Sequence, residues 1–414
     1  MKTGLSRPKH QIRWLLLEGI SPTAPVLLEQ AGYTNVTQLK TALDRDALIE
    51  ALQGVHIVGI RSRTQIDEEI LKAAGTLVAI GCFSVGTNQV DLVGSNRRGV
   101  PVFNAPFSNT RSVAELTIAE IVMLMRGAFT KSMAAHNGRW LKTAAGSNEV
   151  RGKTLGIVGY GNIGSQLAVL AEAMGMRVVY FDHTDKLRHG NVEPVSSLGE
   201  LLAVADVVSL HLPQTPETRG MIGAAEIASM KKGAYLINNA RGTVLDIDAL
   251  AQALRSGHLA GAAVDVFPSE PKSNDEEFVS ALRGLDNVIL TPHVGGSTEE
   301  AQERIGEEVA RRLIEYSDVG STIGAVNFPQ VQLPKGTNNT RFIQVQRNLP
   351  GELGKLNDLF ARYKINIAAQ HYQTDGEIGY VVLDADGPVA NAVEILEEIR
   401  LLSGTIRARL LNRV

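Results

Sequence analysis

Residues 152–182 (GKTLGIVGYGNIGSQLAVLAEAMGMRVVYFD) constrain the fold of this chain more than any other segment. They place Gly159, Gly161 and Gly164 directly after an apolar, strand-like run and directly before a helical one. In that context the first glycine permits a tight turn, the second lets the backbone approach a pyrophosphate, and the third lets helix and strand pack closely. The segment therefore predicts a dinucleotide-binding βαβ unit.

The same segment predicts which dinucleotide binds. We expect free N–H groups at the start of its helix, on Asn162 and Ile163, where they attract an anion. Asp182 stands 18 residues after Gly164, at the end of the next strand, where a carboxylate accepts hydrogen bonds from ribose hydroxyls. A carboxylate there repels a 2′-phosphate, so we expect NAD rather than NADP. A fortuitous pattern of glycines would not place strand, turn, helix and acid in register.

Short apolar runs alternate with helical segments along most of the chain. Such runs indicate strands buried on both faces of parallel sheets, and their alternation with helices predicts a doubly wound α/β architecture. We expect two such Rossmann-like domains in series. The strands of the first cover 13–20, 55–60, 76–81 and 100–105, and those of the second cover 154–160, 177–182, 206–213, 234–240, 261–267 and 287–292.

Two longer helical segments suggest how the domains are connected. Residues 108–129 read as one helix, in which Ser112 and Glu115 form a capping box, and residues 298–316 read as another. If both cross between the domains, the first domain is discontinuous. We expect it to comprise 1–107 and 298–330, with the NAD-binding domain at 108–297.

A third unit follows a linker at 326–340 that is rich in Pro, Gly and Asn. Beyond the linker, the pattern predicts the order strand, helix, strand, strand, helix, strand. This βαββαβ order is typical of a small ferredoxin-like sandwich, which we place at 338–414.

Composition excludes other classes. The formal net charge is −3, from 41 basic and 44 acidic residues, which gives no electrostatic reason to expect nucleic acid or a lipid surface as a partner. The single cysteine, Cys82, excludes an intramolecular disulfide framework and a cysteine-based zinc cluster, and we expect no metal. No apolar run approaches the ~20 residues that span a bilayer, and no signal segment is visible. We expect a soluble, cytoplasmic protein.

Three strands of the second domain each run into a charged residue beside a turn: Arg241, Glu270 and His293. Ligands of open parallel sheets bind outside the carboxyl ends of the strands, so we expect these side chains to converge beside the nicotinamide. Arginine offers a planar fork to a carboxylate, histidine can take a hydroxyl proton, and glutamate can hold the imidazole and favour its cationic form. This set suits the oxidation of a 2-hydroxy acid by NAD.

Each of the three residues also has an ordinary structural explanation. Arg241 could cap a helix or form a surface ion pair, Glu270 could be solvated beside two prolines, and His293 could be a hydrogen-bonded core residue. Their joint occurrence at strand ends of one NAD domain favours the catalytic interpretation.

These motifs resemble the D-isomer-specific 2-hydroxyacid dehydrogenases. The resemblance rests on the glycine-rich segment and on NNARGTVLDIDAL (238–250), GAAVDVFPSEP (261–271) and LTPHVGGSTEEAQ (290–302). It implies that Arg241, Glu270 and His293 are catalytic, with His293 as acid and base. Two roles stay open for Asp265, contact with the nicotinamide carboxamide or a hydrogen-bonded turn. The resemblance implies contacts to NAD from Asn162, Ile163, Asp182, Asn239, Ala240, Arg241, Asp265, His293, Gly295 and Gly296.

Within that family, residues 61–66, 79–92, 101–116 and the C-terminal unit are similar to bacterial three-domain members. The resemblance implies NAD-dependent oxidation of 3-phospho-D-glycerate to 3-phosphooxypyruvate, the first step of L-serine synthesis. Two alternatives are another 2-hydroxy acid such as 2-hydroxyglutarate and an NAD-sensing corepressor of the same fold. Trp140 matches a position that packs against a neighbouring subunit, which implies a homo-oligomer, expected to be a tetramer. The implied substrate-binding residues are Arg61, Ser62, Asn109 and Arg241.

The C-terminal unit resembles an ACT domain, a regulatory module that binds amino acids at a subunit interface. Serine-inhibited relatives use a His and an Asn after the first strand and a second Asn later. The corresponding residues here are Gln346, Asn348 and Asn366. Glutamine donates and accepts hydrogen bonds but cannot become cationic. We expect an ACT fold with L-serine as effector, and the alternative is a module that serves only assembly.

Overall fold

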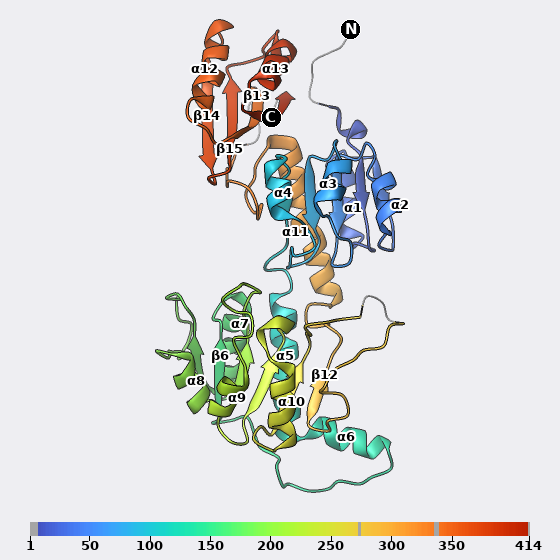
Figure 1. Cartoon of the computed structure of the whole chain (residues 1–414), viewed down its shortest axis with the longest axis vertical. Helices are drawn as coiled ribbons and strands as arrows, with labels where there is room; N and C mark the ends of the chain where they lie inside the picture. Colours follow the sequence, from blue (N-terminus) through green and yellow to red (C-terminus); the bar gives the residue numbers. More distant parts are fainter. Residues whose placement is uncertain (1–6, 272–274, 335–338, 413–414) are drawn as a thin grey trace. The chain divides into compact units, whose positions relative to one another are not determined.

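The computed structural model describes residues 7–271, 275–334 and 339–412, and the chain divides into two compact units (Figure 1). Unit 1 combines Met1–Ser108 with Gln302–Val414, and unit 2 comprises Asn109–Ala301. The first and the C-terminal domains expected from the sequence fall in the same unit, and their separate boundaries stay a prediction. In the described part of the chain, none of the helices combines the length and the apolar character that a bilayer crossing requires.

Unit 2 is built on a seven-stranded sheet with the order β12-β11-β10-β9-β6-β7-β8, in which the paired strands are parallel. All carboxyl ends therefore lie on one edge. The order of connection reverses between β6 and β9, the position at which open α/β sheets bind ligands. The strands are β6 (Thr154–Val158), β7 (Arg177–Phe181), β8 (Glu193–Pro194), β9 (Val207–Leu210), β10 (Tyr235–Asn238), β11 (Gly261–Val264) and β12 (Val288–Leu290).

Helices cover both faces of this sheet. Successive strand residues point to opposite faces, so Ile157 joins a core with α5 and α7, whereas Val158 joins a second core with α8, α9 and α10. Burial on both faces explains why the strands read as continuous apolar runs. The helices are α5 (Thr110–Arg126), α6 (Ala128–His136), α7 (Asn162–Ala173), α8 (Leu198–Val204), α9 (Ala224–Ser229) and α10 (Ile247–Arg255), with a 3₁₀ turn η2 (Gly242–Val244).

The single helix predicted at 108–129 is wrong in two respects. Gly127 adopts φ 56°, a left-handed conformation that ends α5, so α6 is a separate helix. The capping box is also absent, because α5 begins at Thr110, so that Ser112 and Glu115 lie inside the helix. The Ser112 hydroxyl instead lies 2.8 Å from the hydroxyl of Thr298.

The first part of unit 1 is a parallel sheet with the order β2-β1-β3-β4-β5. The short edge strand β2 was not predicted because it is half-exposed and polar, without an apolar run. The elements are η1 (Lys9–Gln11), β1 (Trp14–Leu16), α1 (Thr23–Gln30), β2 (Val36–Gln38), α2 (Arg45–Ala51), β3 (Ile57–Ile60), α3 (Glu68–Ala73), β4 (Ala79–Cys82), α4 (Leu92–Arg97), β5 (Val102–Phe103) and α11 (Glu299–Val319).

The C-terminal part of unit 1 has the predicted βαββαβ order and an antiparallel sheet, β14-β15-β13-β16. Helices α12 and α13 pack on one face of this sheet around Phe342 and Phe360 (Figure 1). The other face contributes Ile343, Val345 and Tyr380 to the core shared with β1 and α11. The fold class is thereby confirmed. The elements are β13 (Thr340–Arg347), α12 (Glu352–Arg362), β14 (Ile367–Thr374), β15 (Ile378–Ala385), α13 (Ala392–Leu401) and β16 (Thr405–Asn412).

Candidate active site

The glycine turn after β6 has the geometry that its sequence predicts. Gly159 adopts φ 93°, and a Cβ there would lie 2.4 Å from the carbonyl oxygen of His211 at the end of β9. A Cβ on Gly164 would lie 2.4 Å from the carbonyl oxygen of Gly159, so only glycine lets α7 approach β6. A Cβ on Gly161 would meet no atom within 4 Å. That open space is what close approach of a pyrophosphate requires.

The start of α7 is prepared for an anion. Gly161 occupies the N-cap position without a side-chain cap, and the N–H groups of Asn162 and Ile163 donate to no other described group. These donors carry the positive end of the helix dipole. The turn and helix therefore fit the pyrophosphate of a dinucleotide.

Asp182 closes this turn from the end of β7. Its carboxylate accepts hydrogen bonds from the N–H of Tyr160 at 2.9 Å and from the N–H of Thr184 at 3.0 Å. Burial alone would raise the pKa of Asp182, but these hydrogen bonds and the nearby Lys186 hold it below its ordinary value. An ionised carboxylate has about four acceptor positions. It therefore keeps capacity for ribose hydroxyls while repelling a phosphate.

The structure brings Arg241, Glu270 and His293 together at the carboxyl ends of the adjacent strands β10, β11 and β12. Nδ1 of His293 lies 2.9 Å and 3.1 Å from the two carboxylate oxygens of Glu270. The N–H of Phe267 donates to Glu270 at 3.0 Å and fixes the carboxylate. Arg241 acts electrostatically on both residues, and its guanidinium donates to the carbonyl of Ala240 at 2.6 Å.

The Glu270 contact raises the pKa of His293 and selects its tautomer. The hydrogen bond to Glu270 raises the pKa of His293, and burial opposes it only in part. Burial in turn would raise the pKa of Glu270, but the imidazole, the N–H of Phe267 and Arg241 keep it below its ordinary value. Because Nδ1–H donates to the carboxylate, Nε2 is the ring nitrogen left to exchange a proton.

A second carboxylate, Asp265, shapes the loop that carries His293. Its side chain accepts hydrogen bonds from the hydroxyl of Thr291 and from the N–H groups of Val294 at 2.8 Å and Gly295 at 2.9 Å. The N–H of His293 donates to the carbonyl of Asp265 at 2.8 Å. These contacts hold His293 at φ 56°, which residues other than glycine rarely adopt. Asp265 is thus the hydrogen-bonded turn acid, and its contact with a carboxamide stays a prediction.

The side chain of Asn239 is turned toward α5 in the protein interior. Its amide nitrogen donates to Glu120 at 2.7 Å and to Thr117 at 3.0 Å, while its amide oxygen has no partner among the described residues. Burial raises the pKa of Glu120 to about 7, despite the hydrogen bond from Asn239. Sequence analysis missed Glu120 because only the tertiary structure brings an acid from α5 behind β10.

The predicted substrate residues lie in both units. In unit 2, Asn109 lies against Gly296, where a Cβ would come within 2.2 Å of the Asn109 amide nitrogen. In unit 1, Arg61 and the exposed Ser62 follow β3. Sequence analysis missed Glu18, a buried residue whose carboxylate accepts the N–H groups of Arg61, Arg63 and Thr64 at 2.9–3.1 Å. No local pattern marks Glu18, since its partners lie over 40 positions away.

The predicted effector residues are not all neighbours within one chain. Gln346 is buried in β13, and its amide oxygen has no described partner. Asn348 receives a hydrogen bond from Tyr372 at 3.2 Å and donates to the carbonyl of Gly376, at the turn between β14 and β15. Asn366 precedes the other end of β14, a strand whose eight residues span about 23 Å from first to last at ~3.3 Å per residue. Among the described residues, no cluster of three or more potential metal ligands occurs.

Comparisons with known proteins agree with this geometry. Residues 118–295 match the model of the D-isomer specific 2-hydroxyacid dehydrogenase NAD binding domain, and residues 343–407 match an AHAS small subunit-like ACT domain. The chain is 54% identical over 411 residues to D-3-phosphoglycerate dehydrogenase of Haemophilus influenzae, covering 99% of this chain and 100% of that one. It is 47% identical over 410 residues to D-3-phosphoglycerate dehydrogenase 1 of Saccharomyces cerevisiae, covering 96% and 87%.

A solved structure extends the comparison. The D-lactate dehydrogenase of Aquifex aeolicus, complexed with NAD and lactic acid, matches with a TM-score of 0.68 and 29% identity, covering 77% of this chain and 100% of that one. The matched domain and this NAD-complexed neighbour confirm NAD as the cofactor expected from the glycine turn.

The contrast between the glycines gives a direct test of the NAD site. Gly161→Ala should fold with an unchanged melting temperature but bind NADH at least about tenfold more weakly, because the new methyl group occupies the open space over the turn. Fluorescence titration with NADH measures the affinity, and thermal unfolding measures the fold.

Two matched variants control this test. Gly199→Ala also enters open space, but on α8, and should leave NADH affinity unchanged. Gly164→Ala should lower the melting temperature because its Cβ meets backbone. Normal NADH affinity in Gly161→Ala would contradict the assignment.

Proposed function

We propose that this chain, which belongs to the family of D-isomer-specific 2-hydroxyacid dehydrogenases, oxidises 3-phospho-D-glycerate to 3-phosphooxypyruvate with NAD, the first step of L-serine synthesis. The observation that carries the chemistry is the convergence of Arg241, Glu270 and His293 on the sheet edge that also holds the dinucleotide turn. The choice of substrate is supported by relatives named D-3-phosphoglycerate dehydrogenase at 47–54% identity over nearly the whole chain.

The three residues divide the oxidation between them. NAD, when bound, accepts the hydride that leaves C2 of the substrate. Nε2 of His293 takes the hydroxyl proton as the C2–O bond becomes a carbonyl, and Glu270 stabilises the imidazolium through Nδ1. The Arg241 fork holds the substrate carboxylate and favours a partial negative charge on the 2-oxygen. The reverse reduction uses the same groups, with the imidazolium as proton donor.

Further residues are proposed to define substrate and cofactor binding. Arg61 and Ser62 supply a cation and a hydroxyl that suit the phosphate of the substrate, and the amide of Asn109 suits its oxygens. Glu18 is proposed to position the loop of Arg61. Its carboxylate accepts hydrogen bonds from three backbone N–H groups of that loop, those of Arg61, Arg63 and Thr64. Asn239, Ala240, Gly295 and Gly296 are proposed to contact NAD through the backbone of the two loops that follow β10 and β12.

Regulation by L-serine at the ACT domain is part of the proposal. Asn348 and Asn366 lie at opposite ends of β14, so a site that uses both needs two C-terminal domains side by side. Oligomerisation is also supported by Trp140, which follows α6 and is 83% exposed. We assign the active protein to a homotetramer in the cytoplasm.

The substrate is tested by steady-state assays of NADH formation. We expect kcat/KM for 3-phospho-D-glycerate to exceed that for D-2-hydroxyglutarate and D-lactate by at least about 10²-fold. A phosphate offers Arg61 more charge and one more acceptor oxygen than the second carboxylate of 2-hydroxyglutarate, and lactate has no second anionic group. A higher value for 2-hydroxyglutarate would reassign the substrate, and no NADH formation with any 2-hydroxy acid would favour a sensor of NAD.

Glu270→Gln should move the acidic limb of the pH profile of oxidation to lower pH. Oxidation requires the neutral imidazole, so activity rises with pH through the pKa of His293, which Glu270 raises above its ordinary ~6.5. Removing the negative charge lowers this pKa, and the acidic limb of kcat/KM should move toward ~6.5 while kcat falls by up to ~10²-fold.

The reduction of 3-phosphooxypyruvate is the internal control for this prediction. It needs the imidazolium, so its activity in Glu270→Gln should decline at a lower pH than in the wild type. If the pH profiles of oxidation and of reduction are both the same in Glu270→Gln as in the wild type, Glu270 does not raise the pKa of His293.

Serine regulation is tested by adding L-serine to the assay, with D-serine as the matched control. We expect L-serine alone to inhibit, and Asn348→Ala to weaken inhibition by up to ~10-fold, the value of one hydrogen bond, while kcat without serine stays unchanged. If L-serine and D-serine affect the activity equally, the ACT domain does not bind serine as an effector and serves only in assembly.

A further inference from the structure

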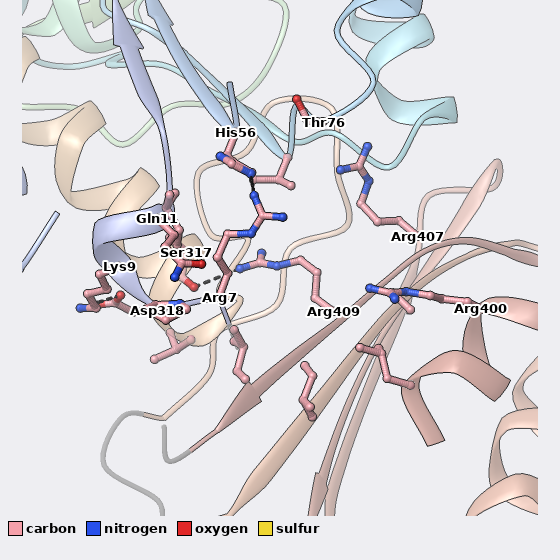
Figure 2. A pocket seen from close by; sticks show the side chains of 18 of the residues that line it. Arg7, Lys9, Gln11, His56, Thr76, Ser317, Asp318, Arg400, Arg407 and Arg409 are labelled. Atoms are coloured by element: carbon pink, nitrogen blue, oxygen red, sulfur yellow. Dashed lines mark hydrogen bonds and ion pairs between the residues drawn. The ribbon is translucent and has the colours of Figure 1, made fainter. Parts of the chain in front are cut away.

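A cavity of about 1160 Å³ lies within unit 1, and none of the residues assigned to the active site lines it (Figure 2). It is lined by the segment around η1, by the residues that precede β3 and β4, by the end of α11, and by β16 and α13. Small-molecule sites commonly enclose roughly 300–1,000 Å³, so the cavity has room for a ligand of several groups.

The cavity is strongly basic. Among the described residues that line it, Asp318 is the one acid, and it already binds Lys9 at 2.8 Å and the hydroxyl of Tyr33 at 2.6 Å. Lys9 and Arg400 form ion pairs with Asp318 and Glu397, so the remaining positive charge comes from Arg7 on one wall and from Arg407 and Arg409 on the other. The basic lining residues are Arg7, Lys9, His56, Arg400, Arg407 and Arg409.

One wall presents two guanidinium groups that have no carboxylate partner among the described residues. Arg407 and Arg409 are two positions apart in β16, so their side chains lie on the same face of the strand. Both extend toward Arg7 and His56 (Figure 2). Arg409 donates to the carbonyl of Ser317 at 3.0 Å, and the described residues offer Arg407 no hydrogen bond or ion pair. Burial and the neighbouring Arg409 lower the pKa of Arg407. An anion between the two arginines would relieve this repulsion.

The opposite wall presents two donors that face each other. Nδ1 of His56 accepts the backbone N–H of Arg13 at 3.0 Å, so the neutral ring carries its proton on Nε2. Nε2 is in contact with the guanidinium of Arg7, which can only donate. Burial, Arg7 and Arg13 together lower the pKa of His56 to about 4, so the ring is neutral at pH 7. Both groups line the cavity and both can donate, so an anionic oxygen there can accept from either.

We propose that this cavity is a second anion site that binds a small molecule with two phosphate groups, one held by Arg407 and Arg409 and the other by Arg7 and His56. Guanidinium groups match phosphate oxygens in bidentate geometry, and a phosphate offers three acceptors where a carboxylate offers two. Arg407 and Arg409 belong to strand β16 of the C-terminal sheet, whereas Arg7 precedes η1 and His56 directly precedes β3 of the parallel sheet. A bound diphosphate ties these two sheets together.

Calorimetric titration of the full-length protein with inorganic pyrophosphate tests this site. NADH is kept at saturation so that the turn after β6 is filled. We expect saturable binding to the wild type, at least about tenfold weaker binding to Arg407→Gln and Arg409→Gln, and unchanged binding to Arg362→Gln. Arg362 is the matched control because it lies exposed on α12, paired with Glu398.

Two further measurements keep the test decisive. Without pyrophosphate, Arg407→Gln should melt no lower than the wild type because it removes an unpaired charge, so lost binding would not reflect lost folding. Citrate should bind more weakly than pyrophosphate. Equal affinity of wild type and Arg407→Gln for pyrophosphate, or no saturable binding to the wild type, would overturn the site. Tighter binding of citrate would overturn the phosphate class.

Discussion

The contact between Nδ1 of His293 and the carboxylate of Glu270 is the interaction on which the active-site chemistry depends. It raises the pKa of the imidazole and leaves Nε2 to exchange protons. Asp265 holds the loop that carries His293, whose backbone is left-handed there, by accepting hydrogen bonds from the N–H groups of Val294 and Gly295 and from the hydroxyl of Thr291. The buried carboxylate of Asp265 thus fixes the loop backbone, and the more exposed carboxylate of Glu270 fixes the imidazole ring.

The parallel sheet of unit 2 makes this arrangement compatible with a cofactor. Its carboxyl edge carries the glycine turn after β6 and, on β10, β11 and β12, the three residues of the proposed reaction. The turn lies at the reversal of strand order, against the end of β9. In unit 1, by contrast, the C-terminal sheet shares a hydrophobic core with β1 and α11, so the ACT fold is joined to the first sheet by packing as well as by chain connection.

Local patterns explain what could be predicted from the sequence. The glycine spacing, the apolar runs and the charged residues after three strands predicted the fold class, the cofactor and the joint position of Arg241, Glu270 and His293 at one edge. Interactions between distant segments could not be read this way. Glu18 contacts a loop more than 40 positions away, and Glu120 meets Asn239 across 119 positions. The break at Gly127 was missed because the apolar helical pattern continues through it.

The central claim is that Glu270 holds His293 as the Nδ1–H tautomer with a raised pKa. Nitrogen-15 NMR of protein labelled at histidine measures both properties, and the spectrum of His293→Gln identifies the signal of His293. The account predicts a neutral ring protonated at Nδ1 and a pKa above the ordinary ~6.5. A neutral ring protonated at Nε2, or a pKa at or below ~6.5, would contradict it.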